Sequence, residues 1–165
     1  MVNEKMLKEM LNTVPTDKNI VFVGIGTDKA IFDSLGCLTC SMLEAKGYTC
    51  YGTIEKPIHA LNVEESMDNI MKKHSNDIII GIDAAIGKIV GNIAFRNKSI
   101  KPGLGVNKKL REVGSYSIIG VTTNTEKRDF NNVRLYSVIK MCEEIVETIE
   151  EFVKIRGGKN AFKKN

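Results

Sequence analysis

Long apolar runs are missing from this sequence. Its 165 residues contain no uninterrupted apolar stretch of roughly 18 or more, the length that a membrane-spanning helix needs. The first residues, MVNEKMLKEML, carry Glu4 and Glu9 within their apolar pattern. They lack the charged start, apolar centre and small-residue cleavage site of a signal peptide. We therefore expect a soluble cytoplasmic protein that has no membrane partner.

Cysteine and histidine, which supply most transition-metal ligands, are scarce: the chain has four cysteines and two histidines. Cys37 and Cys40 have the spacing of a redox or zinc pair, but they fall inside a predicted helix. No second pair and no nearby histidine completes a zinc site. In a cytoplasmic protein we expect all four cysteines to be reduced and to serve as small buried side chains. The sequence therefore predicts neither a metal nor a cofactor.

Internal repeats, linkers and low-complexity tracts are also absent, so we expect one domain over residues 1–153. The net charge is +4, but residues 154–165 hold five basic side chains and no acids. The remaining 153 residues are therefore almost neutral. This distribution predicts a basic, flexible tail over residues 154–165 and gives no reason to expect a nucleic-acid partner.

The order of apolar patterns along the chain predicts the fold class, because patterns typical of helices alternate with patterns typical of strands. Helices are expected at residues 3–12, 34–46, 63–73 and 131–155, and strands at 19–25, 48–53, 77–83, 89–96 and 115–121. Strands that alternate with helices favour an α/β fold, a three-layer α/β/α sandwich with a mainly parallel central sheet. In such sheets ligands bind beyond the carboxyl ends of the strands.

The stretch VFVGIGTDKAIFDSLG, residues 21–36, suggests a nucleotide-binding loop at first sight. A dinucleotide site needs a third glycine at position 29, where this chain has Lys29. The predicted helix begins too late to meet a pyrophosphate, and Asp28 and Asp33 would repel one. We therefore rank an oxyanion or nucleotide site well below the other interpretations.

Two aspartates at the predicted carboxyl edge of the sheet fit acid–base chemistry better. Asp33 precedes the helix at 34–46, where it would act as the N-cap and be kept ionised by the helix dipole. Asp83 is expected to end the most buried strand, where desolvation raises its pKa. Two carboxyls in unlike environments divide the roles of base and acid. Taken singly, each residue has a structural alternative as a helix cap or a turn residue.

Four ordered motifs carry a family resemblance: GIGTDKAIFDSLG, YGTIEKPIHALN, IIIGIDAAIG and IKPGLGVNKKLREVGSYSIIGV. Together they resemble the YyaC-type sporulation proteins, which are similar to the germination (spore) protease and, more remotely, to hydrogenase maturation proteases. The resemblance implies a phosphorylase/hydrolase-like α/β/α fold and a role in the forespore or mother cell of a sporulating bacterium. It also implies an aspartic-type endopeptidase that cleaves small acid-soluble spore proteins.

The resemblance also implies site residues. Asp33 in FDSLG and Asp83 in IDAAIG match the two catalytic aspartates of the germination protease. Hydrogenase maturation proteases bind nickel with two acids and a histidine, but this chain has no histidine after Asp83, so no metal is expected. His59 in KPIHALN is a candidate for substrate binding or an ordinary loop histidine. Four residues of the glycine-rich loop are candidates for binding a peptide backbone, unless that loop is only surface: Gly103, Gly105, Asn107 and Lys108.

These observations leave two main hypotheses. In the first, the protein is a peptidase of sporulation in which Asp33 activates water and Asp83 donates a proton. In the second, the same cleft captures a protein or peptide without cutting it. The family resemblance favours the first without deciding it, because a fold can host several functions.

Overall fold

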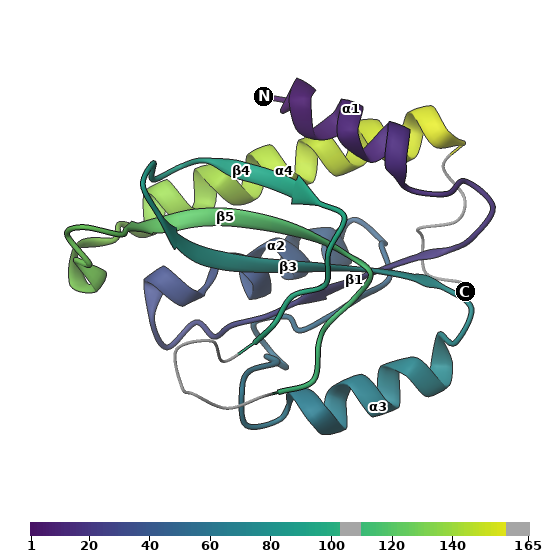
Figure 1. Cartoon of the computed structure of the whole chain (residues 1–165), viewed down its shortest axis with the longest axis horizontal. Helices are drawn as coiled ribbons and strands as arrows, with labels where there is room; N and C mark the ends of the chain where they lie inside the picture. The colour runs from purple at the N-terminus through teal and green to yellow at the C-terminus, as the bar shows by residue number, and fades with distance from the viewer. Residues whose placement is uncertain (103–109, 158–165) are drawn as a thin grey trace.

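The computed structural model describes residues 1–102 and 110–157, which form a single mixed sheet with helices on both faces (Figure 1). The α-helices are α1 (Glu4–Thr13), α2 (Leu35–Ala45), α3 (Val63–Lys73) and α4 (Leu135–Arg156). The strands are β1 (Ile20–Gly24), β2 (Cys50–Tyr51), β3 (Ile78–Gly87), β4 (Ile93–Arg96) and β5 (Tyr116–Asn124). Two 3₁₀ turns, η1 (Ile31–Asp33) and η2 (Phe130–Asn132), complete the elements. The predicted α/β/α sandwich is confirmed.

The strands lie in the order β2-β1-β3-β5-β4, and only the edge strand β4 runs antiparallel to its neighbour. The sequences of the central strands β1 and β3 explain why these segments form buried strands. All five residues of β1, IVFVG, and the first five of β3, IIIGI, are buried. Continuous apolar runs of this kind suit strands that are covered on both faces, as parallel strands are. The sheet is therefore mainly parallel, as predicted.

Helices are distributed unequally between the two faces. Figure 1 shows α3 alone on one side of the sheet, with α1 and α4 on the other. On that more crowded side, α1, α2 and α4 bury Met6, Leu43 and Ile145 against strand residues such as Phe22 and Ile80. On the opposite face, α3 packs over β1 and the start of β3, and its core residues are Val63, Met67 and Ile70. The isolated bridge between Ile100 and Val113 continues this thinner layer.

The four cysteines are all free and buried. Cys37 and Cys40 lie on α2, Cys142 lies on α4, and Cys50 lies on β2. Burial raises the pKa of the Cys37 and Cys142 thiols to about 11. The expectation of reduced, small buried side chains agrees with these positions. Within the described residues, no helix has the length and apolar character needed to cross a membrane.

Several element boundaries differ from the sequence expectation. β3 continues from Asp83 to Gly87, because Ala84–Gly87 stay paired with β5. The prediction that Asp83 ends its strand was therefore wrong. The final helix continues to Arg156, three residues into the segment predicted as a tail. The Arg156 guanidinium donates hydrogen bonds to the backbone carbonyls of Pro15 and Lys18, which anchors the helix end.

Candidate functional site

A turn at Gly26, directly after β1, positions Asp33. Gly26 has φ +121°, and a Cβ there would lie 2.0 Å from the Asp33 carbonyl oxygen. The Thr27 amide donates to that same oxygen at 3.1 Å, which closes the loop between β1 and η1. The glycine is therefore required because two backbone segments meet here. This close contact explains the glycine-rich motif without any bound phosphate.

A second glycine holds the start of α2 against the sheet. A Cβ on Gly36 would lie 2.4 Å from the Ile25 carbonyl oxygen and 2.5 Å from that of Ile82. The helix can therefore approach the end of β1 and the middle of β3 only because position 36 has no side chain. This contact places Asp33, two residues before the helix, close to the strand that carries Asp83.

The structure assigns the helix cap differently from the sequence. Ser34 occupies the N-cap position of α2 and Asp33 is the last residue of η1. The Ser34 side chain makes no capping bond either, because its hydroxyl donates to the Ile31 carbonyl at 2.7 Å. The prediction that Asp33 caps the helix was wrong. Its carboxylate instead lines a pocket.

Asp83 projects from the middle of β3 onto the face that α3 partly covers. It pairs with Ile119 of β5, and its Oδ1 accepts a hydrogen bond from the Ala84 amide at 2.8 Å. Neighbouring residues on the same face, such as Gly81, pack beneath Ile100. The strand alternation that buries Ile82 in the main core therefore aims Asp83 away from it, into the pocket.

The two carboxyl groups have different proton affinities. Burial, and after it the nearby charge of Asp33, raises the pKa of Asp83 to about 8, although the Ala84 amide opposes the rise. Burial also raises the pKa of Asp33, while the Thr27 amide and the His59 charge lower it. Asp33 is thus not held ionised by a helix dipole as expected. At neutral pH Asp83 is mostly protonated, so one carboxyl is ready to donate a proton.

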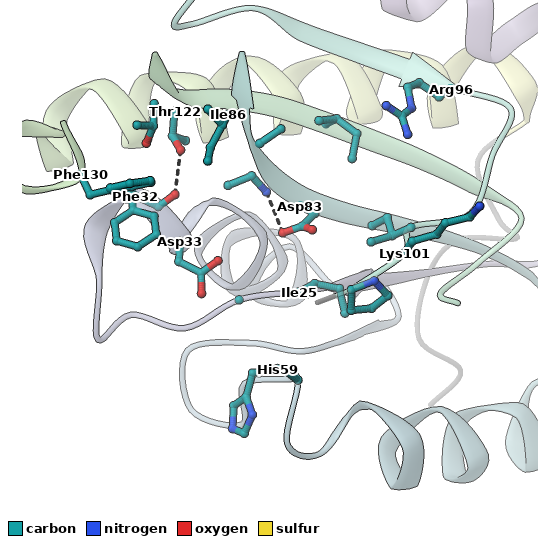
Figure 2. A pocket seen from close by; sticks show the side chains of 18 residues that line it. Ile25, Phe32, Asp33, His59, Asp83, Ile86, Arg96, Lys101, Thr122 and Phe130 are labelled. Atoms are coloured by element: carbon teal, nitrogen blue, oxygen red, sulfur yellow. Dashed lines mark hydrogen bonds between the residues drawn. The ribbon is translucent and has the colours of Figure 1, made fainter. Parts of the chain in front are cut away.

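The pocket that contains both acids has a volume of about 540 Å³. Figure 2 shows Asp33 and Asp83 extending into it from different elements, with Phe32 and Phe130 at one end. Those two rings lie 4.7 Å apart. Much of the lining is apolar and includes Ile25, Ile100 and Ile119. Such a cleft, apolar with a few convergent polar groups, is typical of a binding site.

Sequence reasoning missed several lining residues. The Thr122 hydroxyl donates to the Phe32 carbonyl at 2.7 Å and so fixes η1 against β5. Arg96 and Lys101 line the end of the pocket opposite the aromatic pair, as Figure 2 shows. The residues TTN, at positions 122–124, offered a weak signal, because they directly follow the strand predicted at 115–121 and so fall at the expected carboxyl edge of the sheet. Nothing in the sequence pattern linked the two cations to the aspartates.

The other predicted substrate residues have mixed positions. His59 lines the pocket, but in Figure 2 its imidazole points away from Asp83. Its Nδ1 accepts from the Leu61 amide at 3.2 Å, and its own amide donates to Asn62 Oδ1 at 2.8 Å. Asn62 therefore holds the His59 loop and makes no side-chain cap for α3. The predicted loop residues lie outside the described part of the chain: Gly103, Gly105, Asn107 and Lys108.

The pocket offers a poor set of metal ligands. Over residues 1–102 and 110–157, no three histidine, cysteine or acidic side chains are grouped so that they could hold one ion. Asp33 and Asp83 supply two oxygen ligands, and the imidazole of His59 is engaged by its own loop. These residues do not fit the two acids and a histidine of a nickel site, so no chemical step is assigned to a metal.

The fold is similar to that of one solved protease structure. The structure resembles the [NiFe] hydrogenase maturation protease HycI from Thermococcus kodakarensis KOD1, with a TM-score of 0.58 and 17% sequence identity. The match covers 90% of this chain and 99% of that one. At this identity the likeness establishes the fold alone.

Residues 1–148 match the family described as protein of unknown function (DUF1256), and the chain belongs to that family. It is 36% identical over 138 residues to an uncharacterized protein, YyaC, of Bacillus subtilis (strain 168). That match covers 79% of this chain and 67% of the Bacillus protein.

Proposed function

We propose that the protein is a peptidase in which Asp33 and Asp83 activate water for hydrolysis of a peptide bond. The observation that supports this most directly is the pair itself. Two carboxyls line one pocket, and the pKa of Asp83 is raised to about 8 partly by the charge of Asp33. Pairs of titratable groups whose environments separate their pKa values are typical of acid–base sites.

The chemistry follows from the two protonation states. Ionised Asp33 takes a proton from water as the water oxygen forms a bond to the peptide carbonyl carbon. Protonated Asp83 donates its proton to the carbonyl oxygen in the same step. When the tetrahedral intermediate collapses, the C–N bond breaks and Asp33 gives its proton to the leaving amine. Asp83 recovers a proton from the intermediate's hydroxyl group, so both acids return to their starting states.

The cellular setting is part of the same proposal. The resemblance to YyaC-type sporulation proteins favours a substrate among the small acid-soluble spore proteins. It also favours a location in the cytoplasm of the forespore or mother cell. Expression of the gene during spore formation, measured against vegetative growth, tests this setting independently of the chemistry.

A non-catalytic binding module is the second candidate. The same apolar pocket would hold an extended peptide, and the protonated Asp83 would donate a hydrogen bond to its carbonyl without cutting it. The specific observation in favour is the position of Asp83, which is half-buried on its strand and bonded to the Ala84 amide. This candidate predicts binding of a peptide that survives intact.

One experiment separates the two candidates. The purified protein is incubated with acid-soluble spore proteins, and fragments are identified by mass spectrometry. We expect cleavage by the native chain and a loss of at least about 100-fold in Asp33→Asn and in Asp83→Asn. Asp28→Asn is the matched control, because Asp28 is an exposed acid in the same loop. Equal turnover in Asp33→Asn and Asp28→Asn would contradict the proposal.

A further inference from the structure

The pocket carries acidic and basic side chains in different places. In Figure 2, Asp33 lies near the aromatic pair, Asp83 lies further along the pocket, and Arg96 and Lys101 lie at the end opposite the aromatic pair. Much of the remaining lining is apolar. A ligand that spans this pocket therefore meets acids, apolar side chains and cations.

Sheet register explains why Arg96 shares a face with Asp83. Arg96 of β4 lies opposite Ser117 of β5, and Ser117 lies opposite Gly81 of β3, two residues before Asp83. Directly paired residues project to the same face, and alternate residues of one strand do too. The neighbours Ile93 and Phe95 point into the core on the other face. Arg96 therefore lies two strands away from Asp83 and is offset from it by two residues along the strand direction. With the usual strand spacing and rise per residue, their Cα atoms are about 12 Å apart.

Within the part of the chain that the structure describes, the charge of Arg96 takes part in no contact that stabilises the fold. Among residues 1–102 and 110–157, its side chain makes no ion pair or hydrogen bond, and it is exposed. Lys101 has one partner, Glu112, at 3.7 Å, and the Lys101 side chain is 66% exposed. Exposed pairs of this kind contribute little to stability. Both cations can therefore turn to a ligand at small cost.

We infer that Arg96 and Lys101 form a subsite for a carboxylate of the bound peptide, which makes acidic or C-terminal segments the preferred substrates. This inference rests on the proposed function for the identity of the ligand as a peptide. The planar guanidinium of Arg96 matches a carboxylate through two parallel hydrogen bonds, and Lys101 adds a point charge. An acidic ligand also stays away from the Asp33 end, where repulsion would oppose it, so the charges fix its direction.

The spacing specifies where the carboxylate lies. An extended peptide advances about 3.4 Å per residue, so a separation of about 12 Å corresponds to roughly three residues. Side-chain length widens this range. We expect the carboxylate about two to four residues from the bond held over the aspartates, supplied either by a Glu or Asp side chain or by the chain terminus.

A positional library of N-acetylated octapeptides tests the subsite. Each position is fixed in turn as Glu, Gln or Lys, and every peptide is made with a free or an amidated C-terminus. Retention on immobilised protein and cleavage are both read by mass spectrometry. We expect Glu to be favoured over Gln by about fivefold to tenfold at one position, as for a charge-assisted pair. If binding is instead favoured by a free C-terminus and lost when the C-terminus is amidated, the group bound by the subsite is the terminal carboxylate.

Substitutions then assign the preference to the cations. Arg96→Gln and Lys101→Gln should each reduce it severalfold, and Arg96→Glu should turn it toward Lys. Lys98→Gln is the control, because Lys98 is exposed on the same connection and does not line the pocket. An acidic preference that is absent in the native chain, or unchanged in Arg96→Glu, overturns the subsite. Cleavage without acidic preference overturns the subsite alone, whereas retention of acidic peptides without cleavage overturns only the peptidase.

Discussion

At the scale of single residues, the raised pKa of Asp83 connects the site to stability. The folded protein keeps Asp83 protonated up to about pH 8, whereas an unfolded chain releases that proton near pH 3.9. Between these values the folded state binds one proton more than the unfolded state. Stability therefore falls as pH rises across this window, by about 1.4 kcal/mol per pH unit from this residue.

Asp83→Asn should remove that dependence. An Asn at this position is close in shape to the protonated acid and carries no charge at any pH. We expect denaturant midpoints of the native chain to fall between pH 5 and 7.5, and those of Asp83→Asn to stay nearly level. The variant should thus be the more stable protein at pH 7.5. Parallel curves for the two proteins would show that Asp83 is ionised in the fold.

At the scale of elements, the seating of α2 depends on Gly36. A methyl group there would meet two backbone oxygens at 2.4 and 2.5 Å, which are unable to move aside as a flexible side chain would. Gly36→Ala should lower the free energy of unfolding by about 1–3 kcal/mol, as overpacking does. Glu44→Ala, on the exposed face of the same helix, is the control.

The same substitution should also affect the site. Because α2 must move away from the end of β1 and the middle of β3, Asp33 moves away from Asp83 and the charge of Asp33 acts on Asp83 less strongly. Chemical shifts of the Asp83 carboxyl carbon, followed by NMR against pH, should then titrate at a lower pH than in the native chain. A stable Gly36→Ala protein with an unchanged titration would separate helix seating from the site.

Elements also show how far sequence reasoning extends. β1, the first half of β3 and the stripe of α4 from Val138 to Ile149 were predictable, because each is a clear apolar period that packing confirms. The extension of β3 to Gly87 was not, since AAIG is a weak strand former and is paired only because β5 lies beside it. Arg96 lies in the site because of how β3, β5 and β4 pair with one another. That pairing joins residues far apart in the chain, so no local sequence pattern could have indicated it.

At the scale of the whole molecule, the proposed mechanism makes the aspartate pair set the pH range of activity. In that mechanism, hydrolysis needs Asp33 ionised and Asp83 protonated. The pKa of Asp33 is raised from its ordinary value and that of Asp83 is raised to about 8. We expect kcat/KM to follow a bell-shaped profile whose alkaline limb falls near pH 8. Activity that stays constant to pH 10 would exclude Asp83 as the proton donor.

The closed loop between Gly26 and Asp33 has a consequence for how such a protein can diversify. Its ends are joined by the hydrogen bond from Thr27 to the Asp33 carbonyl, and Thr122 holds the Phe32 carbonyl next to it. All of these anchors act on backbone atoms. Residues 28–31 can therefore change in sequence, and even in number, without displacing the aspartate. The loop is a place where relatives can acquire new selectivity while the acid beside it keeps its position.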